Sequence, residues 1–501
     1  MNIQFGLFCA LLSAPCVFAG DQRNTAFDGP VFGSIIETKA TCFESSVELQ
    51  RRLSAGSLSS AELVTDLLLR IEALNTKGPV LNAVIEVNPD ALEIAAQLDR
   101  ERSSGNNRGP LHGIPVLVKD NIDTADKMQT TAGSPALAGQ PAQYDAFVVQ
   151  RLRAAGAIIL GKANLSEWSN FRDSGIPNGW SGRGGQTRNP HDLQADTSGS
   201  SSGSAVGVAA GFAPIAVGTE TNGSIIMPAH ANGVVGVRPT VGLLSRAGVI
   251  PISSRQDTPG PMARTVTDAA IMLAAMSGTD ARDKATYQNP FDPVDYPGYL
   301  RTDALRGIRL GYPTRMPDGR FMDKDPAFLT LKDVFLAAGA ILIPVDIPRA
   351  QRYSEWHLLR DDFKRELEAY LQTRPGLGIR TLEDVIAFNV NYPGTENYSQ
   401  ENLIESSSAF LNQAGYFAEA TELRRYHRQL IDGLLQRHSL DMLIDWSENS
   451  LGFAGAIAGY PGISLPVGRD EQGLPRGLYF LSTAWDEARL LSVAYSLEQA
   501  L

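Results

Sequence analysis

Hydrophobic runs alternate with amphipathic stretches along most of the chain. An apolar run from Leu111 to Lys119 is typical of a buried strand. After Ser59, apolar residues recur every three or four positions from Leu63 to Leu74, which indicates a helix with one buried face. Residues 308–345 show the order strand, helix, strand. This alternation predicts an α/β fold in which helices cover both faces of a sheet.

The second half of the chain continues the pattern less regularly. Residues 352–440 are predicted to be mostly helical, and we interpret them as a cap or lid over the sheet. Two runs, Ile457–Val467 and Leu478–Phe480, are predicted as closing strands. Earlier in the chain, Asn88 is predicted to be the N-cap of a helix. Because no repeat, low-complexity tract or charged linker divides the chain, we expect residues 20–501 to form a single domain.

Residues 1–19 resemble a secretory signal peptide, with a short apolar run and small residues before Gly20. No positively charged side chain precedes the apolar run, so an ordinary N-terminal segment remains the alternative. We expect the protein to be secreted or periplasmic. No later run reaches the ~18–20 apolar residues that a membrane span requires.

Charge and cysteine content argue against some classes of function. The 501 residues carry a net charge of −11, and nucleic-acid binding requires clustered Lys and Arg instead. The three cysteines, Cys9, Cys16 and Cys42, show no spacing with histidine that indicates a zinc site. We therefore expect neither nucleic acid, metal nor cofactor as a partner. We expect a monomer.

Two serine- and glycine-rich loops carry the candidate chemistry: Asp196–Ala205 and Gly218–Ala229. Glycine lets backbone N–H groups point into a site without obstruction by Cβ, and acyl transfer needs such donors around a developing oxyanion. Our hypothesis is that Ser224 is a nucleophile activated by Ser200 and Lys119. The N–H groups that bind the substrate oxygen are then expected in the stretch Thr221, Asn222, Gly223 and Ser224.

Each of these residues also has an ordinary interpretation. A lysine at the end of an apolar strand usually reaches solvent, and Ser/Gly-rich loops are often simple connections. A catalytic role for Lys119 needs its pKa lowered by roughly 3 units, or about 4 kcal/mol, through burial. A rival nucleophile, Ser201, fits the pattern G-x-S-x-G, although no buried strand precedes it. The six histidines have no catalytic spacing, and we interpret them as structural or surface residues.

At this point the chain resembles the amidase signature hydrolases. The resemblance lies in Gly113-Ile-Pro-Val-Leu-Val-Lys-Asp-Asn121, Asn164-Leu-Ser-Glu167, the two Ser/Gly loops, and Gln256-Asp-Thr-Pro-Gly-Pro-Met-Ala-Arg264. It implies the amidase-signature fold, with a central twisted mixed sheet. It also implies a triad of Lys119, Ser200 and Ser224, with a cis peptide bond before Ser200, and an enzyme that hydrolyses amides without a cofactor.

Within this family the chain is most similar to peptide amidases, which remove the C-terminal amide of peptides. Trp168-Ser-Asn-Phe-Arg172 and Thr240-Val-Gly-Leu-Leu-Ser245 carry that likeness. Two alternatives stay open: a general aliphatic or aromatic amidase, and a non-catalytic subunit like the amidase-type component of tRNA-dependent transamidation. The loops 168–190 and 440–455 are expected to decide specificity.

The chain departs from the family pattern around the nucleophile. Ser198 and Ser202 replace glycines, and Ile226 replaces a frequent arginine. Asn222 stands where many members have glycine, and it is acceptable there because Asn tolerates a positive φ.

The leader yields the first prediction. Expressed in a host that exports it, the protein should begin at Gly20, because the run Val17-Phe-Ala19 offers a signal peptidase a small residue at the cleavage point. Intact-mass spectrometry of the exported protein measures this directly. A chain that retains residues 1–19 would contradict the interpretation, and a substitution of Ala19 by a bulky residue is the control that should block cleavage.

Overall fold

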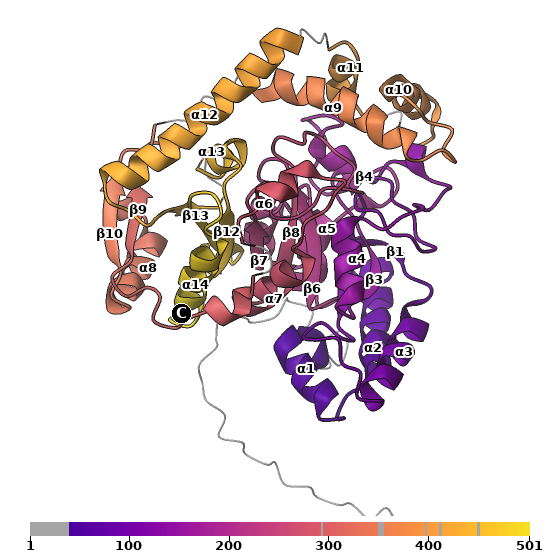
Figure 1. The fold of residues 1–501 in the computed structure, drawn as a ribbon, viewed down its shortest axis with the longest axis horizontal. Helices are drawn as coiled ribbons and strands as arrows, with labels where there is room; N and C mark the ends of the chain where they lie inside the picture. The colour runs from indigo at the N-terminus through magenta and orange to yellow at the C-terminus, as the bar shows by residue number, and fades with distance from the viewer. Residues whose placement is uncertain (1–39, 292–293, 349–354, 396–397, 410–412, 448–450) are drawn as a thin grey trace, which may run out of the picture.

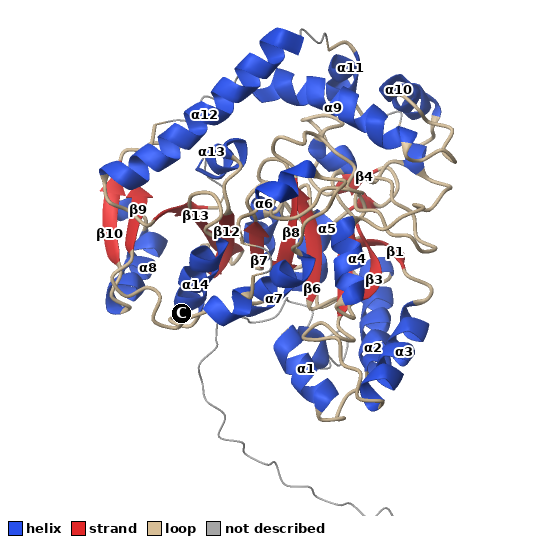
Figure 2. Ribbon diagram, in the orientation of Figure 1, coloured by secondary structure: helices blue, strands red, loops and turns tan. Residues whose placement is uncertain are grey.

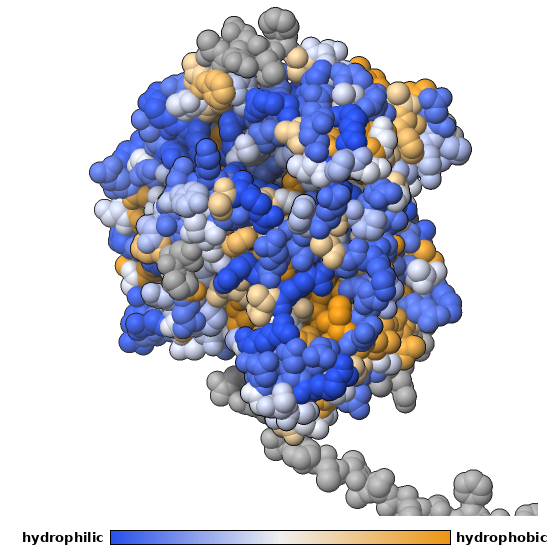
Figure 3. Space-filling model, turned by 45° about the vertical axis from the view of Figure 1, so that its right-hand side comes forward, coloured by the Kyte–Doolittle hydropathy of each residue, from blue (hydrophilic) through white to orange (hydrophobic). Residues whose placement is uncertain are grey.

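The protein is described here by a computed structural model that covers residues 40–291, 294–348, 355–395, 398–409, 413–447 and 451–501. The predicted signal peptide lies outside the described residues. Among the residues described, no helix combines the length and apolar character needed to cross a membrane. The surface seen in Figure 3 is mostly hydrophilic, with scattered apolar side chains.

An eleven-stranded mixed sheet forms the centre of the molecule (Figures 1 and 2). Its strand order is β1-β3-β2-β6-β8-β7-β12-β13-β11-β9-β10. The strands are β1 (Val84–Val87), β2 (Pro115–Lys119), β3 (Ile158–Ala163), β6 (Ile215–Glu220), β7 (Val235–Arg238), β8 (Thr258–Ala263), β9 (Arg309–Pro313), β10 (Ile341–Val345), β11 (Met442–Trp446), β12 (Gly462–Arg469) and β13 (Pro475–Leu481). Two short strands, β4 (Trp180–Ser181) and β5 (Gly185–Gln186), form a separate ribbon.

Parallel pairing occurs at two places in this sheet. Strand β2 lies between β3 and β6 and runs parallel to both, and β9 runs parallel to β10 and β11. All other neighbours are antiparallel. The parallel group β3-β2-β6 matters for the site, because the carboxyl ends of parallel strands meet at one edge of the sheet.

Helices cover both faces of the sheet, as the hydrophobic pattern predicts. The helices are α1 (Ser46–Ser54), α2 (Ser60–Ile71), α3 (Ala91–Ser103), α4 (Phe147–Ala154), α5 (Ser202–Ala209), α6 (Ile226–Asn232), α7 (Val266–Met276), α8 (Pro326–Ala337), α9 (Glu355–Gln372), α10 (Leu382–Asn391), α11 (Glu401–Ser407), α12 (Gln413–Arg437), α13 (Leu451–Ala458) and α14 (Glu487–Glu498). Helices α5 and α6 contact each other, and α7 contacts both α4 and α14.

Several predicted boundaries agree with the structure and two do not. Helix α2 begins after Ser59, as the hydrophobic pattern predicts, and Ser59 and Glu62 form a capping box there. Asn88 is not the N-cap of α3: the helix begins at Ala91, and Asn88 instead accepts a hydrogen bond from the N–H of Asp90. The predicted strand Ile457–Val467 is also wrong in its first part, because α13 continues to Ala458 and β12 starts only at Gly462.

Helices α9 to α12 form an arc over one edge of the sheet, shown in orange in Figure 1. Phe363 of α9 anchors this arc, since its ring lies 4.8 Å from Phe171 and 6.2 Å from Trp168 in the loop below, centroid to centroid. A second connection is polar: the buried guanidinium of Arg172 donates to backbone oxygens of Thr395 and Tyr398. The helical segment is therefore packed onto the sheet through the loop that follows β3.

This packing gives the second prediction. Phe363→Ala should lower the free energy of unfolding by about 3–5 kcal/mol, because a wholly buried aromatic side chain is deleted and a cavity remains. Urea unfolding followed by tryptophan fluorescence measures the change. Phe417→Ala is the matched control, since Phe417 is 61% exposed on α12 and should cost less than about 1 kcal/mol. Equal effects of the two substitutions would contradict the assigned packing.

Candidate active site

Three neighbouring segments bring the predicted site residues to one edge of the sheet. Lys119 is the last residue of β2, and Ser224 lies in the turn between β6 and α6. Strands β2 and β6 pair in parallel, with Val118 opposite Val217, so both ends point the same way. Ser200 precedes α5, which packs on β2 and β6. The backbone N–H of Ser201 donates to the carbonyl oxygen of Ser224 at 3.1 Å and joins the two loops.

The amine of Lys119 is wholly buried and fully hydrogen-bonded. Its Nζ lies 2.8 Å from Ser200 Oγ, 2.9 Å from Thr219 Oγ1 and 3.2 Å from the Thr219 carbonyl oxygen. Burial lowers the pKa of this amine from 10.5 to about 7, although nearby carboxylates oppose the shift. At neutral pH about half of the molecules therefore carry an uncharged amine here. The interpretation of Lys119 as a solvent-exposed lysine is excluded by this burial.

Ser200 is also wholly buried. The peptide bond between Gly199 and Ser200 is cis, as the resemblance implied. Its hydroxyl oxygen accepts a hydrogen bond from the Lys119 amine, and when the amine is uncharged the hydroxyl can instead donate to the lone pair of that nitrogen. The carbonyl oxygen of Ser200 accepts from the N–H of Ser166, so the loop is fixed to the segment after β3.

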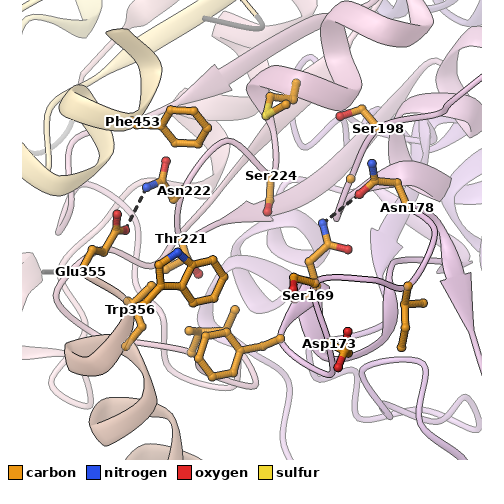
Figure 4. A pocket seen from close by; sticks show the side chains of 18 residues that line it. Ser169, Asp173, Asn178, Ser198, Thr221, Asn222, Ser224, Glu355, Trp356 and Phe453 are labelled. Atoms are coloured by element: carbon orange, nitrogen blue, oxygen red, sulfur yellow. Dashed lines mark hydrogen bonds between the residues drawn. The ribbon is translucent and has the colours of Figure 1, made fainter. Parts of the chain in front are cut away.

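Ser224 lies on the wall of a cavity of about 510 Å³ (Figure 4). The residue is 7% exposed, in contrast to Lys119 and Ser200 behind it. The cavity is also lined by residues 169–171, by Trp356 of α9 and by Phe453 of α13. A cavity of this size accommodates a small molecule or the end of a peptide. Ser224 is thus the member of the predicted triad that a ligand in the cavity can reach.

The turn before Ser224 presents unpaired backbone donors. In the part of the chain that the structure describes, the N–H groups of Asn222, Gly223 and Ser224 donate to no protein acceptor. Gly223 has φ +81°, which side-chain-bearing residues rarely adopt. Asn222 does not have a positive φ. The expected reason for its presence, that Asn tolerates a positive φ, is therefore wrong. Gly223 makes the left-handed turn instead.

Two buried carboxylates hold this turn in place. Glu220 accepts from the N–H groups of Ile225 and Ile226 at 2.7 and 3.1 Å. Asp257 accepts from the hydroxyl of Thr221 at 2.5 Å, and burial raises the pKa of this carboxyl. Sequence reasoning did not assign either carboxylate a role, although both lie inside motifs that it had singled out.

Sequence reasoning also missed the residues that the cap contributes. Glu355 and Trp356, at the start of α9, line the cavity, and Glu355 Oε1 accepts from Asn222 Nδ2 at 2.9 Å. No local motif marks them, because Glu355 lies 133 positions from Asn222 along the chain. The loops expected to decide specificity do reach the cavity, through residues 169–178 and Phe453.

The rival candidates lie elsewhere. Ser201 is wholly buried, donates to the carbonyl of Thr219 and accepts from its N–H, and it does not line the cavity. None of the described residues that line the cavity is a histidine. His112, for example, is buried against the carbonyl of Leu98. Over the residues that the structure describes, no cluster of three His, Cys, Asp or Glu side chains is arranged to hold a metal ion.

Comparisons with known proteins identify the family of this chain. The family model described as Amidase matches residues 62–445. A probable amidase of Arabidopsis thaliana is 42% identical over 397 residues, which cover 78% of this chain and 77% of the relative. A glutamyl-tRNA(Gln) amidotransferase subunit of Halorhodospira halophila is 33% identical, with 90% of this chain and 96% of the relative covered.

Among solved structures, the native peptide amidase of Stenotrophomonas maltophilia is similar over nearly its whole length. The TM-score is 0.86 and the identity 45%, with 91% of this chain and 96% of that chain covered. The chain therefore belongs to the amidase signature family, and it is an amide-hydrolysing enzyme.

Proposed function

We propose that this enzyme hydrolyses a primary carboxamide, with the C-terminal amide of peptides as its substrate, through Ser224, Ser200 and Lys119. The observation that carries the proposal is the 2.8 Å contact between a buried, partly uncharged Lys119 amine and Ser200, behind the cavity where Ser224 is exposed. An uncharged amine is a base, and a serine between base and nucleophile can pass a proton.

In the proposed mechanism Ser224 Oγ attacks the carboxamide carbon as its proton moves to Ser200 and the Ser200 proton moves to Lys119. The C–N bond then breaks, and the proton returns by the same relay to the leaving nitrogen, which departs as ammonia. Water attacks the resulting ester of Ser224 with the same assistance and gives the carboxylate. The charge of the triad is the same before and after the cycle.

The oxyanion is proposed to rest on the N–H groups of residues 221–224. Support comes from the donors of Asn222, Gly223 and Ser224, which have no protein partner among the described residues. Their positions are set by Glu220 and Asp257, so little reorganisation is needed when negative charge develops.

The peptide character of the substrate is supported by the cavity walls and by similarity. Apolar side chains of Phe171, Ile252, Trp356 and Leu359 line the cavity beside polar groups, which suits an acyl portion with a side chain. A peptide amidase from Stenotrophomonas maltophilia of known structure has 45% sequence identity to this chain.

A second candidate function is that of a partner-bound component, favoured by the likeness to the glutamyl-tRNA(Gln) amidotransferase of Halorhodospira halophila. The proposed export of this protein argues against it, because the tRNA machinery is cytosolic. Ammonia release by the isolated chain, without tRNA or nucleotide, separates the two. A general aliphatic or aromatic amidase is separated by substrates: it hydrolyses benzamide or indoleacetamide as readily as peptide amides.

The third prediction tests the nucleophile. Ser224→Ala should reduce ammonia release from an amidated peptide by a factor on the order of 10⁴ or more, because it removes the hydroxyl proposed to form the acyl-enzyme. Ser201→Ala is the matched control on the rival serine and should retain most of the activity, provided that circular dichroism shows both variants folded. An active Ser224→Ala protein would refute the assignment.

The fourth prediction concerns pH. A lysine whose pKa lies at about 7 becomes a base only above that value, so kcat/KM should rise with pH and level off with a midpoint near 7. Burial also raises the pKa of Glu366 to about 7. Glu366→Gln is therefore the control, and it should leave the midpoint unchanged. A profile that is flat from pH 5 to 9, or that falls through 7, would contradict a neutral Lys119 as base.

A further inference from the structure

The charged side chains that the structure describes on the cavity wall are of one sign. Among the described lining residues there are two carboxylates, Asp173 and Glu355, and no Lys, Arg or His. Both carboxylates are more than nine-tenths buried, at 8% and 3% exposure. A buried carboxylate is costly unless donors or a cation compensate it. How each one is compensated therefore indicates what the cavity is built to receive.

Asp173 has its donors within the protein. Its two oxygens accept from the Ser399 hydroxyl at 2.6 Å and from the N–H groups of Glu401 and Gly175 at 3.0 and 2.7 Å. Burial alone would raise the pKa of this carboxyl, but the hydrogen bonds outweigh burial and lower it. Asp173 connects the cap to the loop below and needs no ligand.

Glu355 is compensated on one oxygen only. Its Oε1 accepts from Asn222 Nδ2 at 2.9 Å and from Gln256 Nε2 at 2.8 Å. Within the described residues, Oε2 accepts no hydrogen bond, and no Lys or Arg forms an ion pair with this carboxylate. Figure 4 shows the side chain on the cavity wall beside Asn222 and Trp356.

The two amides that donate to Glu355 also present acceptors of their own. The amide oxygens of Asn222 and Gln256 are buried, and neither has a donor in the described part of the chain. Trp356 lines the same cavity, and its ring stacks on that of Phe171 with 6.0 Å between the centroids. Unused oxygen acceptors beside an aromatic ring are the surroundings that an ammonium or guanidinium group binds.

We propose that Glu355 is a specificity-determining residue whose second carboxylate oxygen binds a cationic group on the acyl part of the substrate. The inference rests on the proposed function and extends it to amides that carry positive charge near the scissile bond. The cation comes either from a basic side chain of the C-terminal residue or from the α-ammonium of a short peptide. Because Asn222 holds Glu355 and precedes the nucleophile by two residues, the bound charge lies close to the reacting group.

The same charge distribution acts on the product. Hydrolysis converts a neutral carboxamide into a carboxylate inside a cavity that already holds Glu355 and Asp173. Like charges repel, so the product binds more weakly than the substrate. The cavity therefore favours cationic amides before the reaction and releases the acid after it.

A substrate series separates the two sources of the cation. N-acetyl-glycyl-X-amides are compared with X as lysine, norleucine or glutamate, together with unblocked glycyl-norleucine amide. For a basic side chain, kcat/KM should be about tenfold higher for lysine than for norleucine, the effect of one hydrogen bond to a charged group. If the cation is the α-ammonium, kcat/KM for unblocked glycyl-norleucine amide should exceed kcat/KM for its acetylated form by the same factor. In both cases the glutamate peptide should be the poorest substrate.

Glu355→Gln tests whether this residue causes the preference. The variant removes the charge but keeps an oxygen for Asn222 and Gln256, so the preference for the cation should fall to about twofold or less while the norleucine peptide is still hydrolysed. Glu355→Asp should keep the order of the substrates. Glu368→Gln, on the same helix but away from the cavity, is the matched control for the change in net charge and should keep the full preference.

The outcomes divide clearly. Hydrolysis of the norleucine peptide by the native enzyme without any preference for a cation overturns this inference and leaves the proposed function standing. A preference that persists in Glu355→Gln, or an equal loss on all substrates in that variant, also overturns it. Failure to hydrolyse any of these amides removes the proposed function and this inference together.

Discussion

Burial of one amine is the constraint on which the site depends. Moving the pKa of Lys119 from 10.5 to about 7 costs the folded state on the order of 4 kcal/mol at neutral pH, because the unfolded chain would keep the proton. The cost falls as pH rises through this window, so burial of Lys119 opposes folding less at alkaline than at neutral pH. The sheet offsets this cost, because β2 lies between two parallel neighbours and every side chain of the strand is buried there.

A buried base is useful only if the nucleophile beside it is held rigidly and still meets solvent. The turn after β6 meets both conditions. Glu220 and Asp257 fix its backbone and leave the donors before Ser224 unpaired, while Gly223 lets the chain reverse without a side chain in the way. The ion pair between Arg238 and Glu220 compensates the buried carboxylate. Buried charge at this edge of the sheet thus supports the geometry of the turn more than it supports overall stability.

The residues of the proposed triad could be located from short stretches of sequence, whereas the outer wall of the cavity could not. Lys119, Ser200 and the turn around Ser224 lie in local motifs, so their types and spacing carry the information. Strand β8 escaped prediction because Pro259 and Pro261 lack the N–H groups that a strand within a sheet normally uses. Helix α13 is apolar on all sides, so its periodicity does not distinguish it from a buried strand. Glu355 meets Asn222 only through the fold, and no local pattern encodes that contact.

The difference between the triad residues, which lie in local motifs, and the cavity wall, which does not, has a physical basis. Activation of the nucleophile needs atoms within hydrogen-bond distance, and only the adjacent ends of β2 and β6 with the loop before α5 can provide that. Recognition of the acyl portion acts over a larger distance and can come from any segment that packs over the cavity. Here that segment is the cap, anchored by Phe363 and Arg172, which brings a carboxylate and an indole to the wall. Substitutions at the start of α9 can therefore change which amides are bound without disturbing the proposed relay behind Ser224.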